Sequence, residues 1–93
     1  MPEMRFTIRW PDGQRESCYS PSLIVQEYLA PGESYALSVF VAKSRAALEI
    51  ASERVRQKYG FACSAAIGQL ARIEEVAGRQ DPQGHVTVEG FEP

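Results

Sequence analysis

Apolar and polar residues alternate over residues 3–10, which is the pattern of a half-buried β-strand. The apolar positions of this segment are Met4, Phe6, Ile8 and Trp10. The sequence Pro-Asp-Gly at 11–13 follows and is typical of a turn, because proline presets φ and glycine tolerates positive φ. Residues 14–20 are therefore expected to return as the second strand of a β-hairpin.

The length of the turn decides which way Cys18 points. A three-residue loop pairs Phe6 with Cys18 and turns the thiol toward the core, although it also sets Arg9 opposite Arg15, which is unfavourable. A four-residue loop pairs Arg9 with Glu16 and turns Cys18 outward. We favour the three-residue loop, because a two-residue loop would need an N–H group that the proline lacks.

Residues 20–32 predict a short helix. Ser20 fits the cap, Pro21 fits the first helical position, and apolar residues recur four positions apart. The β-branched pair Ile24 and Val25 leaves a strand open as the alternative.

Two longer helical patterns occupy the middle of the chain. The first has the apolar stripe Leu37, Val41, Leu48, Ala51 or Ser52, Val55 and Tyr59. Ser38 is its expected cap and Gly60 its expected left-handed end, with Phe61 folding back on Val55. The second pattern begins near Ser64 and ends at Gly78. Its expected inward residues are Ala66, Ile67, Leu70 and Ile73.

The end of the chain predicts a loop at 79–85 and then a final strand with Val86, Val88 and Phe91 on one side. This strand is expected beside the first one, since an isolated hairpin is marginally stable. Residues 1–93 thus predict a single α+β domain. It has an N-terminal hairpin, two to three helices on one sheet face, and a C-terminal strand that completes a small antiparallel sheet.

Charge and composition narrow the function classes. The net charge is −2 and the pI is about 5.4, which argues against non-specific binding to nucleic acid or to an anionic membrane. No apolar run is long enough for a membrane span, and the first residues do not follow a signal or transit pattern. We therefore expect a cytoplasmic protein whose two cysteines are free thiols.

Two cysteines and one histidine are the candidate reactive groups. Cys18, Cys63 and His85 are widely separated in sequence, so neither a metal site nor another cofactor is expected. Cys63 directly precedes a helix whose positive end would favour a thiolate, and His85 is the single imidazole base. The neighbours of Cys63 are small and apolar, however, and free cysteine is among the most buried residue types. We interpret Cys63 as a packing residue and His85 as an exposed one.

The outer face of the first hairpin is the candidate binding surface. Arg5 and Arg9 share that face with Thr7 and, from the return strand, with Ser17 and Tyr19. Arginine and tyrosine are enriched at the energetic centres of protein interfaces. A solvated sheet face is the equally weighted alternative.

Five segments stand out together as family features. They are MPEMRFTIRWPDG, CYSPS, EYLAPGESY, ALEIASERVRQKYGFACSAA and QLARIE. In these segments the chain resembles the small bacterial nitrogen starvation response proteins, a family whose described member is mycobacterial. The resemblance implies a gene cluster with a nitrilase-superfamily enzyme, a radical-SAM protein, an acetyltransferase-like protein and a flavoprotein. It implies a role in the use of nitriles or similar nitrogen sources, and it brings no catalytic residue.

These observations favour an accessory or regulatory protein over an enzyme. It would bind a protein partner or a second copy of itself through Arg5, Arg9 and Tyr19. The alternative is a small thiol enzyme, or a binder of a small nitrogen compound, that uses Cys63 with His85. A third possibility is a sensor that binds an anion at the start of the last helix.

Overall fold

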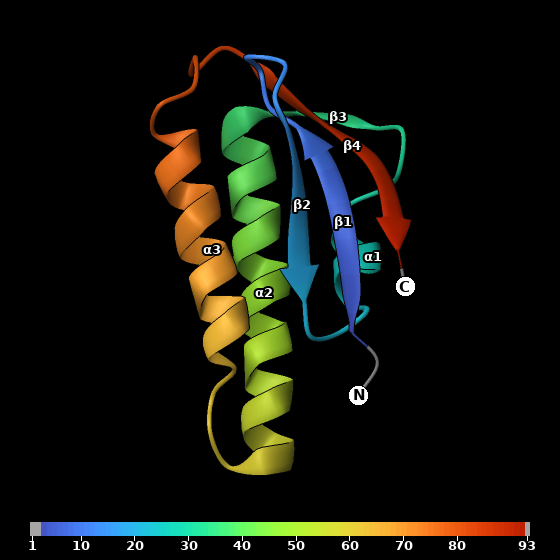
Figure 1. The fold of residues 1–93 in the computed structure, drawn as a ribbon, viewed down its shortest axis with the longest axis vertical. Coiled ribbons are helices and arrows are strands. Elements are labelled where there is room, and N and C mark those ends of the chain that lie inside the picture. Colours follow the sequence, from blue (N-terminus) through green and yellow to red (C-terminus); the bar gives the residue numbers. More distant parts are fainter. Residues whose placement is uncertain (1–2, 93) are drawn as a thin grey trace.

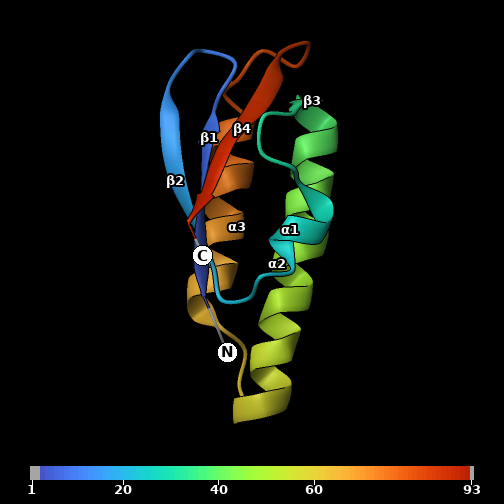
Figure 2. The same cartoon turned by 90° about the vertical axis from the view of Figure 1, so that its right-hand side faces the viewer.

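A four-stranded antiparallel sheet forms one layer of the computed structural model, which describes residues 3–92, and helices form the other layer (Figures 1 and 2). The elements in chain order are β1 (Met4–Arg9), β2 (Arg15–Ser20), α1 (Val25–Tyr28), β3 (Ser34–Ala36), α2 (Leu37–Tyr59), α3 (Ser64–Ala77) and β4 (His85–Glu92). The strand order is β2-β1-β4-β3. The expected α+β architecture is confirmed, and the C-terminal strand lies beside the first strand as predicted.

The hairpin has the three-residue turn that the sequence favours. Phe6 lies opposite Cys18, and the N–H group of Trp10 donates to the Gln14 carbonyl at 2.8 Å across the turn. Gly13 has a φ of 91°, which a side chain would disfavour. Cys18 is consequently fully buried against the helices.

The turn sets Arg9 opposite Arg15. A residue of β4, the strand on the other side of β1 from β2, neutralises this pair. The β1–β4 register shifts between Thr7 and Ile8, which leaves Glu89 as the extra residue of a bulge. One Glu89 oxygen lies 2.9 Å from the Arg9 guanidinium, and the other lies 2.9 Å from that of Arg15. The unfavourable pairing is therefore tolerated because one carboxylate serves both arginines.

The first helix is shorter than predicted. Ser20 ends β2 instead of capping a helix, and its hydroxyl donates to the Ser22 carbonyl at 2.7 Å. The Ser22 hydroxyl in turn accepts from the Ile24 N–H group at 3.2 Å. These side-chain bonds give the backbone an alternative to a helical turn, so α1 keeps only Val25–Tyr28. Pro21 lies before the helix and is buried.

A short strand was not expected between α1 and α2. β3 has three residues and pairs with β4 at the sheet edge, where the hydroxyls of Ser34 and Thr87 are 2.8 Å apart. Three residues are too few to show an alternating pattern, so this strand depends on its partner. α2 follows directly at Leu37, which places Ser38 inside its first turn and makes the predicted Ser38 cap wrong.

The C-terminal part of α2 differs from the predicted stripe. Gly60 ends the helix with a φ of 86°, as predicted. The buried side chains of α2 are Leu37, Phe40, Ser44, Ala47, Leu48 and Ala51. Val55 is only half-buried, and Tyr59 and Phe61 are exposed. Figure 1 shows the reason, because the last turns of α2 extend beyond the sheet and have no strand to pack on.

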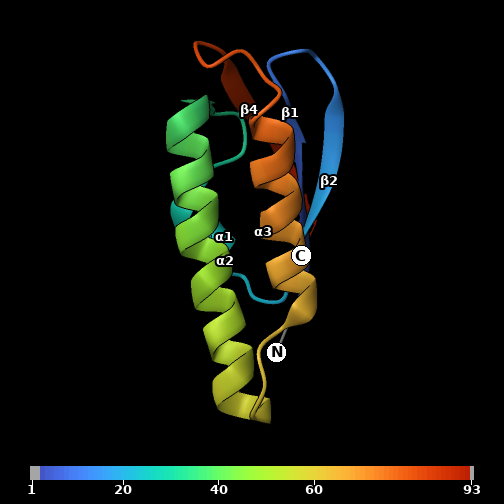
Figure 3. The same cartoon turned by 90° about the vertical axis from the view of Figure 1, so that its left-hand side faces the viewer.

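The core lies between the sheet and the α2–α3 pair. Trp10 meets Phe40 edge-on, with ring centroids 5.7 Å apart, and Phe40 is fully buried. α3 contributes Ile73, which is fully buried, whereas Ile67 was expected to face inward and is exposed. The first turns of α3 lie beside the lower half of α2 (Figure 3), and Ile67 there lines a groove with Ser52 and Glu53.

Replacing Glu89 with alanine is expected to lower the free energy of unfolding by about 0.2–1 kcal/mol, the range for exposed ion pairs. The reason is that Arg9 and Arg15 would then face each other without a counter-charge. In an Arg15→Gln background the same substitution should cost less. Urea unfolding of the four proteins measures the difference, and equal losses in both backgrounds would contradict a shared role for Glu89.

Candidate interaction surfaces

The outer face of the sheet brings together the three residues that the sequence singled out for binding. Arg5 lies directly opposite Tyr19, and Thr7 opposite Ser17. Arg9 lies further along the same side of β1. All three helices pack on the other face of the sheet, so this face is left uncovered (Figure 2).

Hydrogen bonds hold the polar side chains of this face in place. The Arg5 Nε–H donates to the Ser17 hydroxyl at 2.8 Å. The Tyr19 hydroxyl donates to a Glu3 carboxylate oxygen at 3.1 Å. Partial burial, and then this bond to Glu3, raise the pKa of Tyr19, so its phenol stays a neutral donor. The polar side chains of this face therefore have defined positions.

The outer edge of the sheet, at β2, is covered by α3. The backbone N–H of Tyr19 donates to the Gln69 side chain at 2.9 Å, and the Glu16 carboxylate lies 3.2 Å from Arg72. Such contacts protect an edge strand from pairing with another chain. The sequence analysis missed Gln69 and Arg72, because nothing in the local pattern connects them to the hairpin.

Cys63 does not occupy the packed position expected for it. It immediately precedes α3, is half-buried, and lines a hollow of about 200 Å³ together with Tyr19 and Tyr59. Cys63 is less buried than expected because the α2–α3 connection lies beyond the sheet. Its small apolar neighbours Ala62 and Ala65 are exposed there.

His85 lies at the other end of the helical layer from Cys63. It opens β4 opposite Ala36, which directly precedes α2, whereas Cys63 comes after the end of α2 (Figure 1). A helix of 23 residues is about 34 Å long. The structure therefore does not bring Cys63 and His85 together. His85 is exposed, as expected.

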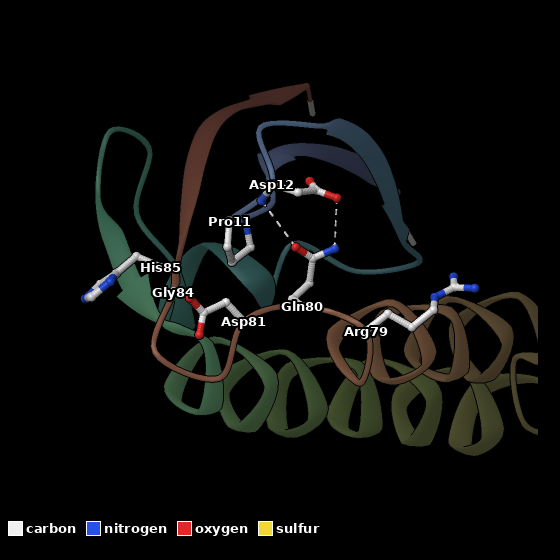
Figure 4. Close-up of a pocket in the computed structure, with 7 residues that line it drawn as sticks. All are labelled: Pro11, Asp12, Arg79, Gln80, Asp81, Gly84 and His85. Atoms are coloured by element: carbon white, nitrogen blue, oxygen red, sulfur yellow. Dashed lines mark hydrogen bonds between the residues drawn. The ribbon is translucent and has the colours of Figure 1, made fainter.

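A hollow of about 290 Å³ adjoins His85 at the junction of the hairpin turn and the 79–84 loop (Figure 4). The Gln80 amide binds Asp12 twice, at 3.2 Å to its N–H group and 3.2 Å to its carboxylate. A Cβ atom on Gly84 would lie 2.5 Å from the Pro11 Cβ. The His85 ring points away from these groups. The hollow therefore marks the contact between the hairpin turn and the 79–84 loop.

The lower part of the α2–α3 pair is a second surface, and the sequence analysis missed it. A groove of about 240 Å³ runs between the helices, and the exposed Ile67 lines it from α3. The lining of the groove is Leu48, Glu49, Ser52, Glu53, Ala66, Ile67 and Leu70.

No group of three or more His, Cys, Asp or Glu side chains in residues 3–92 is placed to hold a metal ion. None of the helices within the same range has both the length and the apolar composition to cross a bilayer.

Cys18 is the deeply buried thiol. Desolvation raises its pKa most, and the nearby Glu16 carboxylate raises it further, to about 12 from an ordinary 9.0. The folded protein therefore keeps a proton that the unfolded chain releases above about pH 9. A group of this kind stabilises the fold less as the pH rises between these two pKa values.

The free energy of unfolding is accordingly expected to fall more steeply above pH 9 in the wild type than in Cys18→Ala. The difference in slope should approach about 1.4 kcal/mol per pH unit. Denaturant unfolding between pH 7 and 11 measures it. Parallel pH profiles of the free energy of unfolding for wild type and Cys18→Ala would contradict the raised pKa of the Cys18 thiol.

Comparison with known proteins identifies the family to which the chain belongs. No curated protein and no solved structure matches the chain. A family model described as nitrogen starvation-induced protein NitG matches residues 5–91. That range includes every element from β1 to β4, apart from the first and last strand residues. The chain therefore belongs to the family of the nitrogen starvation-induced protein NitG.

Proposed function

We propose that this protein is an accessory or regulatory component of nitrogen-starvation metabolism, and that it acts in the cytoplasm by binding another protein through the outer face of its sheet. Membership of the NitG family supports the link to nitrogen starvation. The observation that carries the binding role is the uncovered sheet face with Arg5, Arg9 and Tyr19 held in fixed positions.

Fixed side chains favour binding because less conformational entropy is lost when a partner docks. Arg5 is held by Ser17 and Arg9 by Glu89, so both guanidinium groups are placed before a partner arrives. Each arginine keeps donors free for a carboxylate, since a guanidinium carries five N–H groups. The partner surface should therefore be acidic, with an aromatic or apolar contact for the Tyr19 ring.

An enzyme of nitrile-type nitrogen metabolism is the partner class that this proposal favours. The family resemblance supports it, because a nitrilase-superfamily enzyme is expected to be encoded nearby. We prefer this role to a thiol-dependent reaction, since Cys63 and His85 lie at opposite ends of α2. No small-molecule cofactor enters the proposal.

The test is affinity purification of the tagged protein from nitrogen-starved host cells, with bound proteins identified by mass spectrometry. The variant Arg5→Ala/Arg9→Ala should recover the partner at least about tenfold less well, the loss expected for hot-spot side chains. Its melting temperature should change little, because both side chains are exposed.

The matched control is Lys43→Ala/Arg79→Ala, which removes the same charge from the helical side of the molecule. It should recover the partner as the wild type does. Equal recovery by the sheet-face variant, or equal losses in both variants, would count against this face as the binding site.

A further inference from the structure

The lower α2–α3 face carries apolar surface that the fold itself does not cover. Among residues 3–92 the exposed large apolar side chains are Val39 (43%), Tyr59 (53%), Phe61 (68%) and Ile67 (54%). Three of the four lie at the overhanging end of α2 or on the first turns of α3. Grouped exposed apolar side chains mark contact surfaces more often than scattered ones do.

We propose that this face binds the same face of a second copy of the chain, so that two α2–α3 pairs form an antiparallel four-helix dimer. The inference does not rest on the proposed function, because Glu49, Arg56 and Ile67 belong to the helical layer and not to the outer sheet face (Figures 2 and 3). A two-fold dimer joins the same surface of both copies. That surface, including the charges of α2, must therefore complement itself.

The charges along α2 fit a second copy. Glu49 and Arg56 are seven residues apart, which is two helical turns, so they lie on the same side of the helix. Their midpoint falls between Ser52 and Glu53. An antiparallel helix related by a two-fold axis at that level sets each Glu49 opposite the Arg56 of the other copy. A partner of one charge sign would match only one of these two residues.

The apolar groove lies at the same level as this axis. Ser52 and Glu53 line it from α2, and Ile67 lines it from α3. The two Ile67 side chains of a dimer would therefore meet near the axis, where they are shielded from water. The centre of the contact would combine the two Ile67 side chains with Ser52 and Glu53, and the Glu49–Arg56 pairs would lie on either side of it.

Existing contacts leave this geometry available. Arg56 presently binds Glu53 on its own helix, with Nε and the carboxylate oxygen 2.8 Å apart, and both side chains are about half exposed. Exposed pairs of this kind exchange partners at little cost. The ion pair between Arg45 and Glu74 joins the two helices further up, so the dimer contact is confined to the lower half of the face.

Sedimentation equilibrium of the full chain over the micromolar range tests the proposal. The wild type should show a monomer–dimer equilibrium, and Ile67→Lys should raise its dissociation constant by about tenfold or more. Val39→Lys is the matched control, because it also places a charge at an exposed apolar position of the helical layer. A monomeric wild type, or an unchanged dimer in Ile67→Lys, would overturn the inference.

A charge exchange tests the antiparallel register. Glu49→Arg and Arg56→Glu should each weaken the dimer, because each sets like charges opposite one another twice. Mixing these two variants should restore a dimer that contains one of each, and the double variant should dimerise alone. A mixture no stronger than its components would overturn the register. Arg5→Ala/Arg9→Ala should dimerise normally, which separates a failure here from a failure of the sheet-face proposal.

Discussion

The central strand β1 is the element on which the rest of the structure depends. It pairs with β2 on one side and with β4 on the other, although these strands come from opposite ends of the chain. Phe6 and Ile8 on its inner side are fully buried under the helices. Because side chains of a strand alternate, burying these residues forces Arg5 and Arg9 onto the outer face. The core thus determines that the uncovered face is polar and carries both arginines.

The mismatch in length between the sheet and α2 explains why Tyr59 and Phe61 are exposed. β2 has six residues and α2 has 23. Strands rise about 3.3 Å per residue and helices 1.5 Å, so β2 spans about 20 Å and α2 about 34 Å. The excess must lie beyond the sheet. The apolar pattern of the sequence nevertheless continues to Tyr59, and α3 begins beside the same overhang. Apolar residues without a sheet to cover them are therefore a consequence of this geometry.

Local chemistry made part of the fold predictable. The turn at 11–13 specified the register that buries Cys18, and Gly60 specified where α2 ends. The same two-residue periodicity placed Arg5, Arg9 and Tyr19 on one face. Long-range contacts were not predictable from one sequence, since Glu89 reaches the hairpin from 80 residues away. The serine turn that shortens α1 and the pairing that creates β3 depend on partners in the same way.

The two proposed surfaces are compatible because the sheet and the helices form separate layers (Figure 3). A dimer joined through α2 and α3 would turn both sheet faces outward, and each face would keep its ordered arginines. Two copies of one binding face on a single particle raise the effective concentration of the second contact once the first has formed. A weak sheet-face contact with an oligomeric enzyme would then be strengthened without any further residue at the face itself.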